Sequence, residues 1–179
     1  VHTLTIDDND SPPTIDFDLL VQSLDEGAGA VAIGLSLDRP SGLTVSGTYS
    51  VAGTATDGVD FTSFAGTYTI PVGATAATLD TALLEDTLDE LAETVILTLD
   101  APVNAAVGAT GVHTLTIDDN DAPPTIDFDL LAQSIDEGAG AVAVGLSLDT
   151  PSGLAVSGTY SVGGTAISGT DYTAFAGSY

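Results

Sequence analysis

Apolar residues alternate with small or polar residues along most of the chain. The alternation is clearest in residues 31–37, 45–51, 64–70 and 95–99. A two-residue period places one set of side chains on a single face of a β-strand, where they can be buried together. Gly, Pro, Asn and Asp separate these runs and favour turns between strands. The pattern therefore predicts an all-β fold.

The spacing of the runs predicts a seven-stranded sandwich. The expected strands lie near residues 14–24, 29–37, 43–52, 61–71, 75–84, 92–100 and 110–118. One segment departs from the two-residue period. In LLEDTLDELAET, residues 83–94, Leu84, Leu88 and Leu91 recur at helical spacing, and Thr87 can serve as an N-cap. This segment predicts a single helical turn within a loop.

The chain also repeats itself. Residues 1–68 align without a gap with residues 112–179, at an offset of 111, and 13 of these 68 positions differ. A unit of about 100 residues is typical of an immunoglobulin-like sandwich. We therefore expect residues 1–10 to be the last strand and acidic linker of a preceding repeat, 11–121 a complete repeat, and 122–179 the first half of the next. A longer tandem array is the simplest source of such a chain.

The charge is strongly one-sided. The sequence has 26 acidic residues against one basic residue, Arg39. Nucleic acids and anionic membranes are bound through Lys and Arg, so neither is an expected partner. The absence of cysteine excludes disulfides, thiol catalysis and thiolate metal sites. An acidic surface instead attracts divalent cations.

The acidic residues gather in four places, at Asp25–Glu26, at Asp60, in 85–93 and at 118–121. Each place follows an odd-numbered strand of the predicted order. In an up-and-down sandwich, these loops converge on one end. Carboxylates and carbonyls there can supply the roughly six to eight oxygen ligands that calcium takes.

The last acidic place leads directly into prolines. IDDND is followed by SPP in the first copy and by APP in the second, at residues 6–13 and 117–124. Proline stiffens the backbone, and neighbouring carboxylates repel one another unless a cation lies among them. This stretch predicts a joint between repeats that an ion locks.

Three motifs resemble those of the Calx-β family: GTAISGTDY at 164–172, EDTLDELAE at 85–93 and LTIDDND at 115–121. The resemblance implies tandem seven-stranded immunoglobulin-like (Calx-β) sandwiches with a 111-residue repeat and calcium at one end. Two positions depart from the family pattern, because Asn120 stands where an acid is usual and Glu85 where Asp is usual. The ligands that the resemblance implies are Glu26, Asp60, Glu85, Asp86, Leu88 (through its carbonyl), Glu90, Glu93, Asp119, Asn120 and Asp121. Their equivalents in the partial repeats are Asp8, Asn9, Asp10, Glu137 and Asp171.

These features favour a mechanical role over catalysis. No Ser-His-Asp spacing or phosphate loop is present, and His2 and His113 occupy one repeat position on a strand, as structural histidines do. Near-identical tandem copies predict a calcium-stiffened rod, at the cell surface or secreted, in an adhesin stalk or an extracellular filament. Its expected partners are neighbouring repeats of the same chain, or further copies in a homo-oligomer or filament. The alternatives are a calcium-responsive sensor module and, less favoured, an accessory domain of a carbohydrate-acting enzyme.

Overall fold

The computed structural model describes residues 1–7 and 9–179. The chain forms two compact units, one of residues 1–86 and 91–120 and one of residues 87–90 and 121–179. Strands form the framework of the first unit and one short pair in the second. The helical content is limited to two 3-10 turns, η1 (Glu26–Ala28) and η2 (Glu137–Ala139), in the part of the chain that the structure describes.

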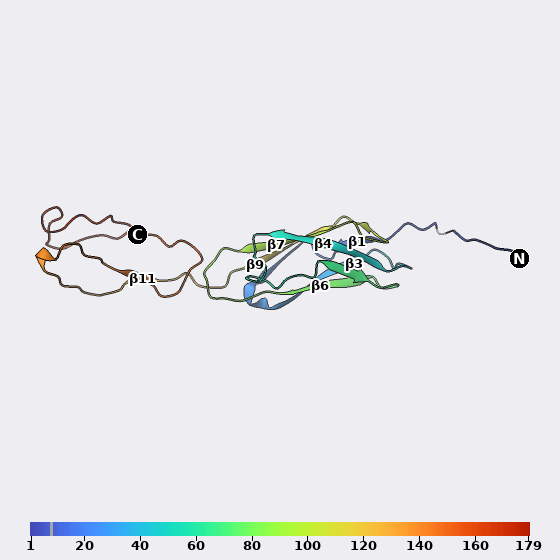
Figure 1. Cartoon of the computed structure of the whole chain (residues 1–179), viewed down its shortest axis with the longest axis horizontal. Coiled ribbons are helices and arrows are strands. Elements are labelled where there is room, and N and C mark those ends of the chain that lie inside the picture. The colour runs from blue at the N-terminus through green and yellow to red at the C-terminus, as the bar shows by residue number, and fades with distance from the viewer. Residues whose placement is uncertain (8) are drawn as a thin grey trace. The chain divides into compact units, whose positions relative to one another are not determined.

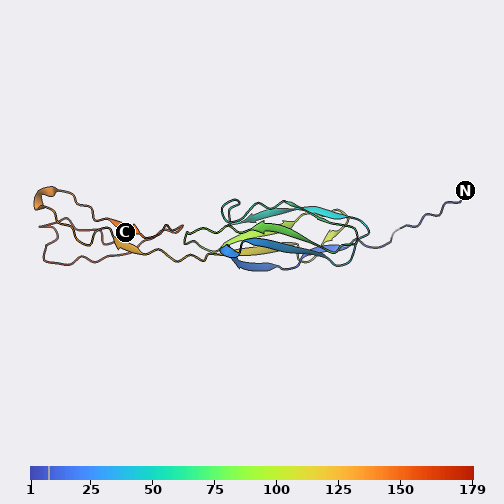
Figure 2. The ribbon, with the colours of Figure 1, turned by 90° about the horizontal axis from the view of Figure 1, so that it is seen from below.

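The first unit is a sandwich of two sheets (Figures 1 and 2). One sheet has the order β6-β3-β1-β8 and the other the order β2-β9-β7-β4-β5. The strands are β1 (Thr14–Phe17), β2 (Val21–Asp25), β3 (Ala30–Leu37), β4 (Val45–Gly53), β5 (Thr67–Ile70), β6 (Ala76–Ala82), β7 (Glu93–Leu99), β8 (Ala106–Val107) and β9 (Val112–Asp118). The all-β sandwich predicted from the alternation is confirmed.

The first predicted strand, 14–24, is divided between the two sheets. β1 pairs antiparallel with β3, whereas β2 pairs parallel with β9 in the opposite sheet. Between them the chain crosses over at residues 18–20, where Leu19 and Leu20 are each 56% exposed. The alternation shows that this segment is extended, but it carries no information on which sheet accepts each half.

The core lies between the sheets and is formed by the predicted apolar positions. Ile15, Leu35, Ile70, Leu97 and Leu115 are completely buried. Burying a side chain of this size stabilises the folded state by about 1.5–3 kcal/mol. The core therefore supports the loops at both ends of the first unit.

The predicted helical turn in 83–94 is wrong. Residues 84–92 form a loop without a helical turn, with Leu83 buried just before it and Leu91 70% exposed. A short helix is stabilised mainly by burying its apolar face, and this loop has no core beneath it to receive Leu91. The helical turn occurs instead at η1, where the Asp25 side chain accepts a hydrogen bond of 3.0 Å from the Gly27 N–H.

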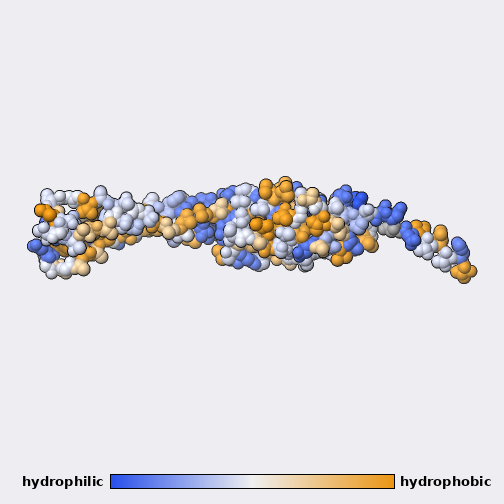
Figure 3. Space-filling view, turned by 90° about the horizontal axis from the view of Figure 1, so that it is seen from above, coloured by the Kyte–Doolittle hydropathy of each residue, from blue (hydrophilic) through white to orange (hydrophobic). Residues whose placement is uncertain are grey.

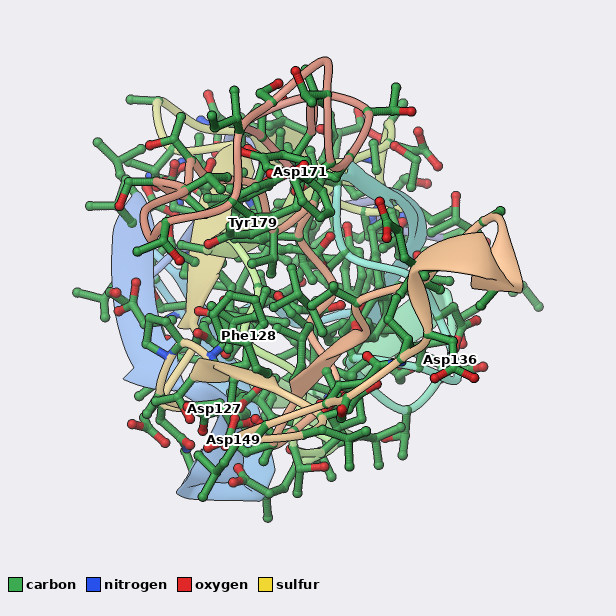
Figure 4. The ribbon with its side chains drawn as sticks, turned by 90° about the vertical axis from the view of Figure 1, so that its left-hand side faces the viewer. Asp127, Phe128, Asp136, Asp149, Asp171 and Tyr179 are labelled. Carbon is green, nitrogen blue, oxygen red and sulfur yellow. The ribbon has the colours of Figure 1, made fainter. Side chains whose placement is uncertain are left out.

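The second unit contains a two-stranded pair, β10 (Ile126–Phe128) and β11 (Leu146–Leu148). The register of the pair places Phe128 opposite Leu146. The same repeat positions in the first unit, Phe17 and Leu35, are also paired. Figure 4 shows this unit from its end, with Phe128 on β10 and Asp149 just beyond β11. The repeated sequence therefore pairs in the same register in both units.

The described residues contain no helix long and apolar enough to cross a membrane.

Candidate metal centre

Hydrogen bonds link the acidic places of the first unit at one end of the sandwich. The side-chain nitrogen of Asn120 donates to Asp25 Oδ1 at 2.7 Å and to Glu85 Oε2 at 3.2 Å. The backbone N–H of Leu84 donates to the carbonyl of Asp60 at 3.0 Å. The ends of β2, β6 and β9 and the loop that holds Asp60 are thus neighbours, as the strand order led us to expect.

Three carboxylates form a group at this end. Glu26, Asp119 and Asp121 each offer an oxygen atom, and these atoms all lie within 4.8 Å of one another. Glu26 belongs to η1, and Asp119 and Asp121 follow β9 on one short run of backbone. No other group of three such residues occurs among residues 1–7 and 9–179.

The surroundings of this group are unfavourable for bare carboxylates. Asp119 and Asp121 are partly buried, and one oxygen of each is buried without a hydrogen-bond partner among the described residues. A buried polar atom without a partner costs free energy, and neighbouring negative charges add repulsion. A hard cation with oxygen ligands removes both costs, and calcium is such a cation. These residues therefore fit a calcium ion.

Gly27 forms one wall of this end. A Cβ atom at this position would lie 2.8 Å from Glu85 Oε2 and 3.1 Å from Asp25 Oδ1. Only a residue without a side chain lets these two carboxylates approach the backbone so closely. At Gly138, the same position in the second repeat, a Cβ atom would have no neighbour within 4 Å.

The remaining predicted ligands of the first unit differ in their surroundings. Asp60 accepts a hydrogen bond of 2.5 Å from the Thr56 N–H, so one of its oxygens closes a turn. Glu93 begins β7 and pairs with Ile117, while Asp86 is partly buried in the loop that follows β6. As ligands, all three stay predictions.

The other predicted positions lie elsewhere in the chain. Asp8 lies outside the described residues. The other positions stay predicted ligands, because their places in the structure neither confirm nor contradict a role in binding calcium. Leu88 and Glu90 belong to the second unit, Asn9 and Asp10 are exposed, Glu137 is exposed in η2, and Asp171 accepts a hydrogen bond of 2.8 Å from the Ile167 N–H.

Asp25 is not among the predicted ligands. Its carboxylate caps η1 and accepts from Asn120, so it holds two of the acidic segments together. The signal in the sequence is an aspartate directly before Glu-Gly, which is a helix N-cap pattern. Asn120 donates through its nitrogen here, so only its oxygen is suited to bind a cation.

The predicted structural histidine is almost completely buried. His113 is 1% exposed, and its Nδ1 lies 2.7 Å from the carbonyl oxygen of Leu19. Its ring packs against Phe17 with 5.6 Å between the ring centroids. The side chain thus joins β9 to the segment between β1 and β2.

The pKa values of two buried tyrosines reflect packing. Burial raises the pKa of Tyr49 and of Tyr68, because a phenolate is poorly solvated there. The negative charge of Asp100 raises the pKa of Tyr68 further. Both side chains belong to the core, as their positions in the alternation predicted.

The model of the Calx-beta domain matches residues 8–121 and, a second time, residues 118–178. The chain belongs to the Calx-beta domain family. This match confirms the resemblance drawn from the three motifs and agrees with the tandem arrangement of the repeat.

Solved Calx structures share the fold of this Calx-beta chain. The apo-form Calx CBD1 domain is 20% identical with a TM-score of 0.57, and the match covers 62% of this chain and 100% of that domain. The calcium binding domain CBD12 of CALX1.1 is 21% identical with a TM-score of 0.56, covering 70% of this chain and 54% of that one. No curated protein matches the chain. At these identities, the structures establish the Calx-beta fold alone.

Proposed function

We propose that this Calx-beta chain is a segment of a calcium-stiffened, tandem-repeat rod. The observation that carries the proposal is the group of Glu26, Asp119 and Asp121, which includes buried carboxylate oxygens without hydrogen-bond partners on the aspartates. The group stands where the last strand of a complete repeat runs into Ala122-Pro123-Pro124. An ion bound there would act directly on the backbone that leads to the next repeat.

Calcium is the cation that best fits this chemistry. All candidate ligands are oxygen atoms, the chain has no cysteine, and the net charge of −25 attracts divalent cations. Glu26, Asp119 and Asp121 would hold the ion, with Glu85 as a further oxygen ligand. Bound calcium would neutralise the repulsion among these carboxylates and tie η1 to the segment that follows β9.

The near-identity of the repeats favours stiffness of the chain as the property that bound calcium supplies. The 55 identities in 68 aligned positions give successive joints nearly the same chemistry. A rod benefits from such uniformity, whereas a sensor needs only one or two divergent copies. The expected setting is extracellular, as the stalk of a surface adhesin or the body of a filament, where even sites with a Kd of about 10⁻⁴–10⁻³ M can be occupied. The role is binding and mechanical, with no catalysed step.

Calorimetry of the full chain with and without calcium tests the metal centre. Ions that bind only the folded state add about 2.7 kcal/mol to the free energy of unfolding at a hundredfold excess over Kd. We expect a chelator to lower the melting temperature of the first unit, and the double variant Glu26→Gln, Asp119→Asn to abolish that effect. Asp80→Asn, an exposed acid on β6, is the matched control.

Small-angle scattering tests the mechanical part of the proposal. A chain with several repeats should become longer and less variable in end-to-end distance when calcium is added, and the double variant should not respond. If a chelator changes neither the melting temperature nor the scattering curve at low ionic strength, the proposal is wrong. The acidic residues would then be only a solvated surface. A large change of shape over a narrow range of calcium concentration would instead support a sensor module.

A further inference from the structure

A loop of the first repeat contacts a turn of the second repeat within the second unit. The N–H of Gly153 donates to the carbonyl of Asp89 at 3.1 Å. The hydroxyl of Ser152 lies 3.1 Å from Asp89 Oδ2 and donates to it. One aspartate is therefore held by its backbone and by its side chain.

Gly153 is shaped for this contact. A Cβ atom at Gly153 would lie 2.5 Å from Glu90 Oε1 and 2.8 Å from Glu90 Cγ. The loop of residues 87–90 is thus seated directly on the glycine. A larger residue at this position would displace the Glu90 side chain from its place against the turn.

The first unit carries the same turn. Pro40-Ser41-Gly42-Leu43 has the same sequence as residues 151–154. The N–H of Leu43 donates to Ser41 Oγ at 3.0 Å, and the N–H of Leu154 donates to Ser152 Oγ at 3.1 Å. The serine hydroxyl therefore accepts the same hydrogen bond in both turns.

At the Ser41–Gly42 turn, no described loop occupies the place that residues 87–90 take at the Ser152–Gly153 turn. A Cβ atom at Gly42 would have no neighbour within 4 Å, and no acceptor for the Gly42 N–H is found among residues 1–7 and 9–179. The turn borders an open hollow of about 870 Å³, which Pro13, Arg39 and Asn104 also line. Figure 3 shows hydrophilic residues gathered at this end of the first unit, where the N-terminal segment joins it.

The hollow is lined by one basic residue, Arg39, and by one acidic residue, Asp10. Arg39 is the only Lys or Arg of the sequence, and its side chain is half exposed beside the turn. It donates to the carbonyl of Pro12 at 3.0 Å and lies 3.8 Å from Asp38. The loop segment 85–90, EDTLDE, carries four carboxylates. In the second repeat the residue at the position of Arg39 is Thr150.

We propose that the Ser41–Gly42 turn and its hollow are the docking site for the 87–90 loop of another copy of the repeat, placed before this one. Asp89 of that copy binds the Ser41 hydroxyl and the Gly42 N–H, and its neighbouring acids face Arg39. The inference rests on the proposed rod, since it supplies the contact between successive repeats, but it requires no calcium.

Disulfide trapping tests the docking site, because the natural sequence has no cysteine. The 87–90 loop of the chain itself is occupied by Ser152 and Gly153, so the full chain is lengthened by a copy of residues 1–111 placed before Val1 in the same register. Asp89→Cys in the added copy is combined with Ser41→Cys in the chain. We expect this pair to close at least about tenfold faster than Asp89→Cys paired with Ser50→Cys on β4, because docking raises the effective concentration of one thiol near the other.

Two variants sharpen the test. Gly42→Val adds a side chain into space that is open in its own unit, so the fold is retained while the place of the Glu90 side chain is blocked, and cross-linking should slow. Arg39→Thr reproduces the second repeat, and it should slow cross-linking at low salt and remove its dependence on ionic strength.

The pair Asp89→Cys and Ser152→Cys in the unlengthened chain is the positive control. If this pair closes and the Asp89–Ser41 pair does not, the docking site is wrong. If neither closes, the contact on which the inference is built is not held in solution, and the inference also falls. Trapping in chelator separates the two proposals, since docking should persist there while the calcium effects on melting and scattering vanish.

Discussion

Residues 1–7 and 112–118 have the same sequence, VHTLTID, and two different structures. The second copy is β9, in which Leu115 and Ile117 are 0% and 5% exposed. In the first copy no strand is present, and Leu4 and Ile6 are 76% and 86% exposed. β9 lies between β2 and β7, whereas no described strand pairs with residues 1–7. The alternation shows which side chains can be buried, and pairing decides whether they are.

The two repeats extend this comparison. β1–β3 and β10–β11 share a register, but Leu35 is completely buried while Leu146 is partly exposed. In the first unit β6 flanks β3 and the second sheet covers it. The contribution of a residue to the free energy of unfolding should therefore depend on the residues packed around it, even where the two repeats have the same sequence.

The largest effect is expected at the duplicated strand. Leu115→Asp places a carboxylate in the core of the first unit and should cost more than about 4 kcal/mol, enough to unfold it. Leu4→Asp changes the same motif on an exposed side chain and should stay within about 0.5 kcal/mol. Denaturant unfolding followed by circular dichroism measures both. Equal losses in the two variants would show that residues 1–7 are buried in solution.

A smaller effect is expected at the shared register position. Leu35→Ala should cost about 2–5 kcal/mol through lost burial and the cavity that remains. Leu146→Ala removes the same atoms from a partly exposed position and should cost less than half as much. Hydrogen exchange resolves the two units in one chain. A loss at Leu146 as large as at Leu35 would mean that another surface covers the second unit.

The acidic ends can be compared through one pair of glutamates. Glu26 joins the group with Asp119 and Asp121, whereas Glu137 is exposed in η2. Glu26→Gln should therefore remove most of the rise in melting temperature that calcium produces, and Glu137→Gln should leave it intact. Calcium titration by calorimetry provides a second measurement. A response that depends on Glu137 alone would move the metal centre to the second repeat.

The smallest effect concerns Asp149 and pH. The hydroxyl and the N–H of Thr125 donate to this carboxyl and hold its pKa below the ordinary value of 3.8. Because the pKa is lower in the folded state, the stabilisation is complete above the unfolded pKa and is lost as the pH falls through the folded pKa. An NMR titration of the Asp149 carboxyl carbon should give a midpoint below 3.8, and Thr125→Val should raise it. A midpoint that does not change in the variant would remove the Thr125 hydroxyl as a cause, since valine keeps the N–H that also donates.

Much of the candidate site followed from the order of strands. An acidic loop after every second strand predicted that Glu26, Asp60, Glu85 and Asp119 would lie at one end, because alternate loops of a sandwich share an end. Burial of individual oxygens could not be predicted, since it depends on how the loops pack. For the same reason, the pattern did not reveal that Asn120 braces Asp25 and Glu85 through its nitrogen.

The sequence by itself determined the 111-residue repeat, the all-β class, the core positions and the four acidic places, because each depends on local period or on direct comparison of the copies. Only the tertiary structure decided that residues 14–24 divide between two sheets, that residues 84–92 contain no helical turn, and that one copy of VHTLTID is a buried strand. The physical reason is that backbone hydrogen bonds between strands and burial of the core are made with residues far away along the chain. A local pattern can specify which face a side chain takes, but the partner that covers this face is set by the whole fold.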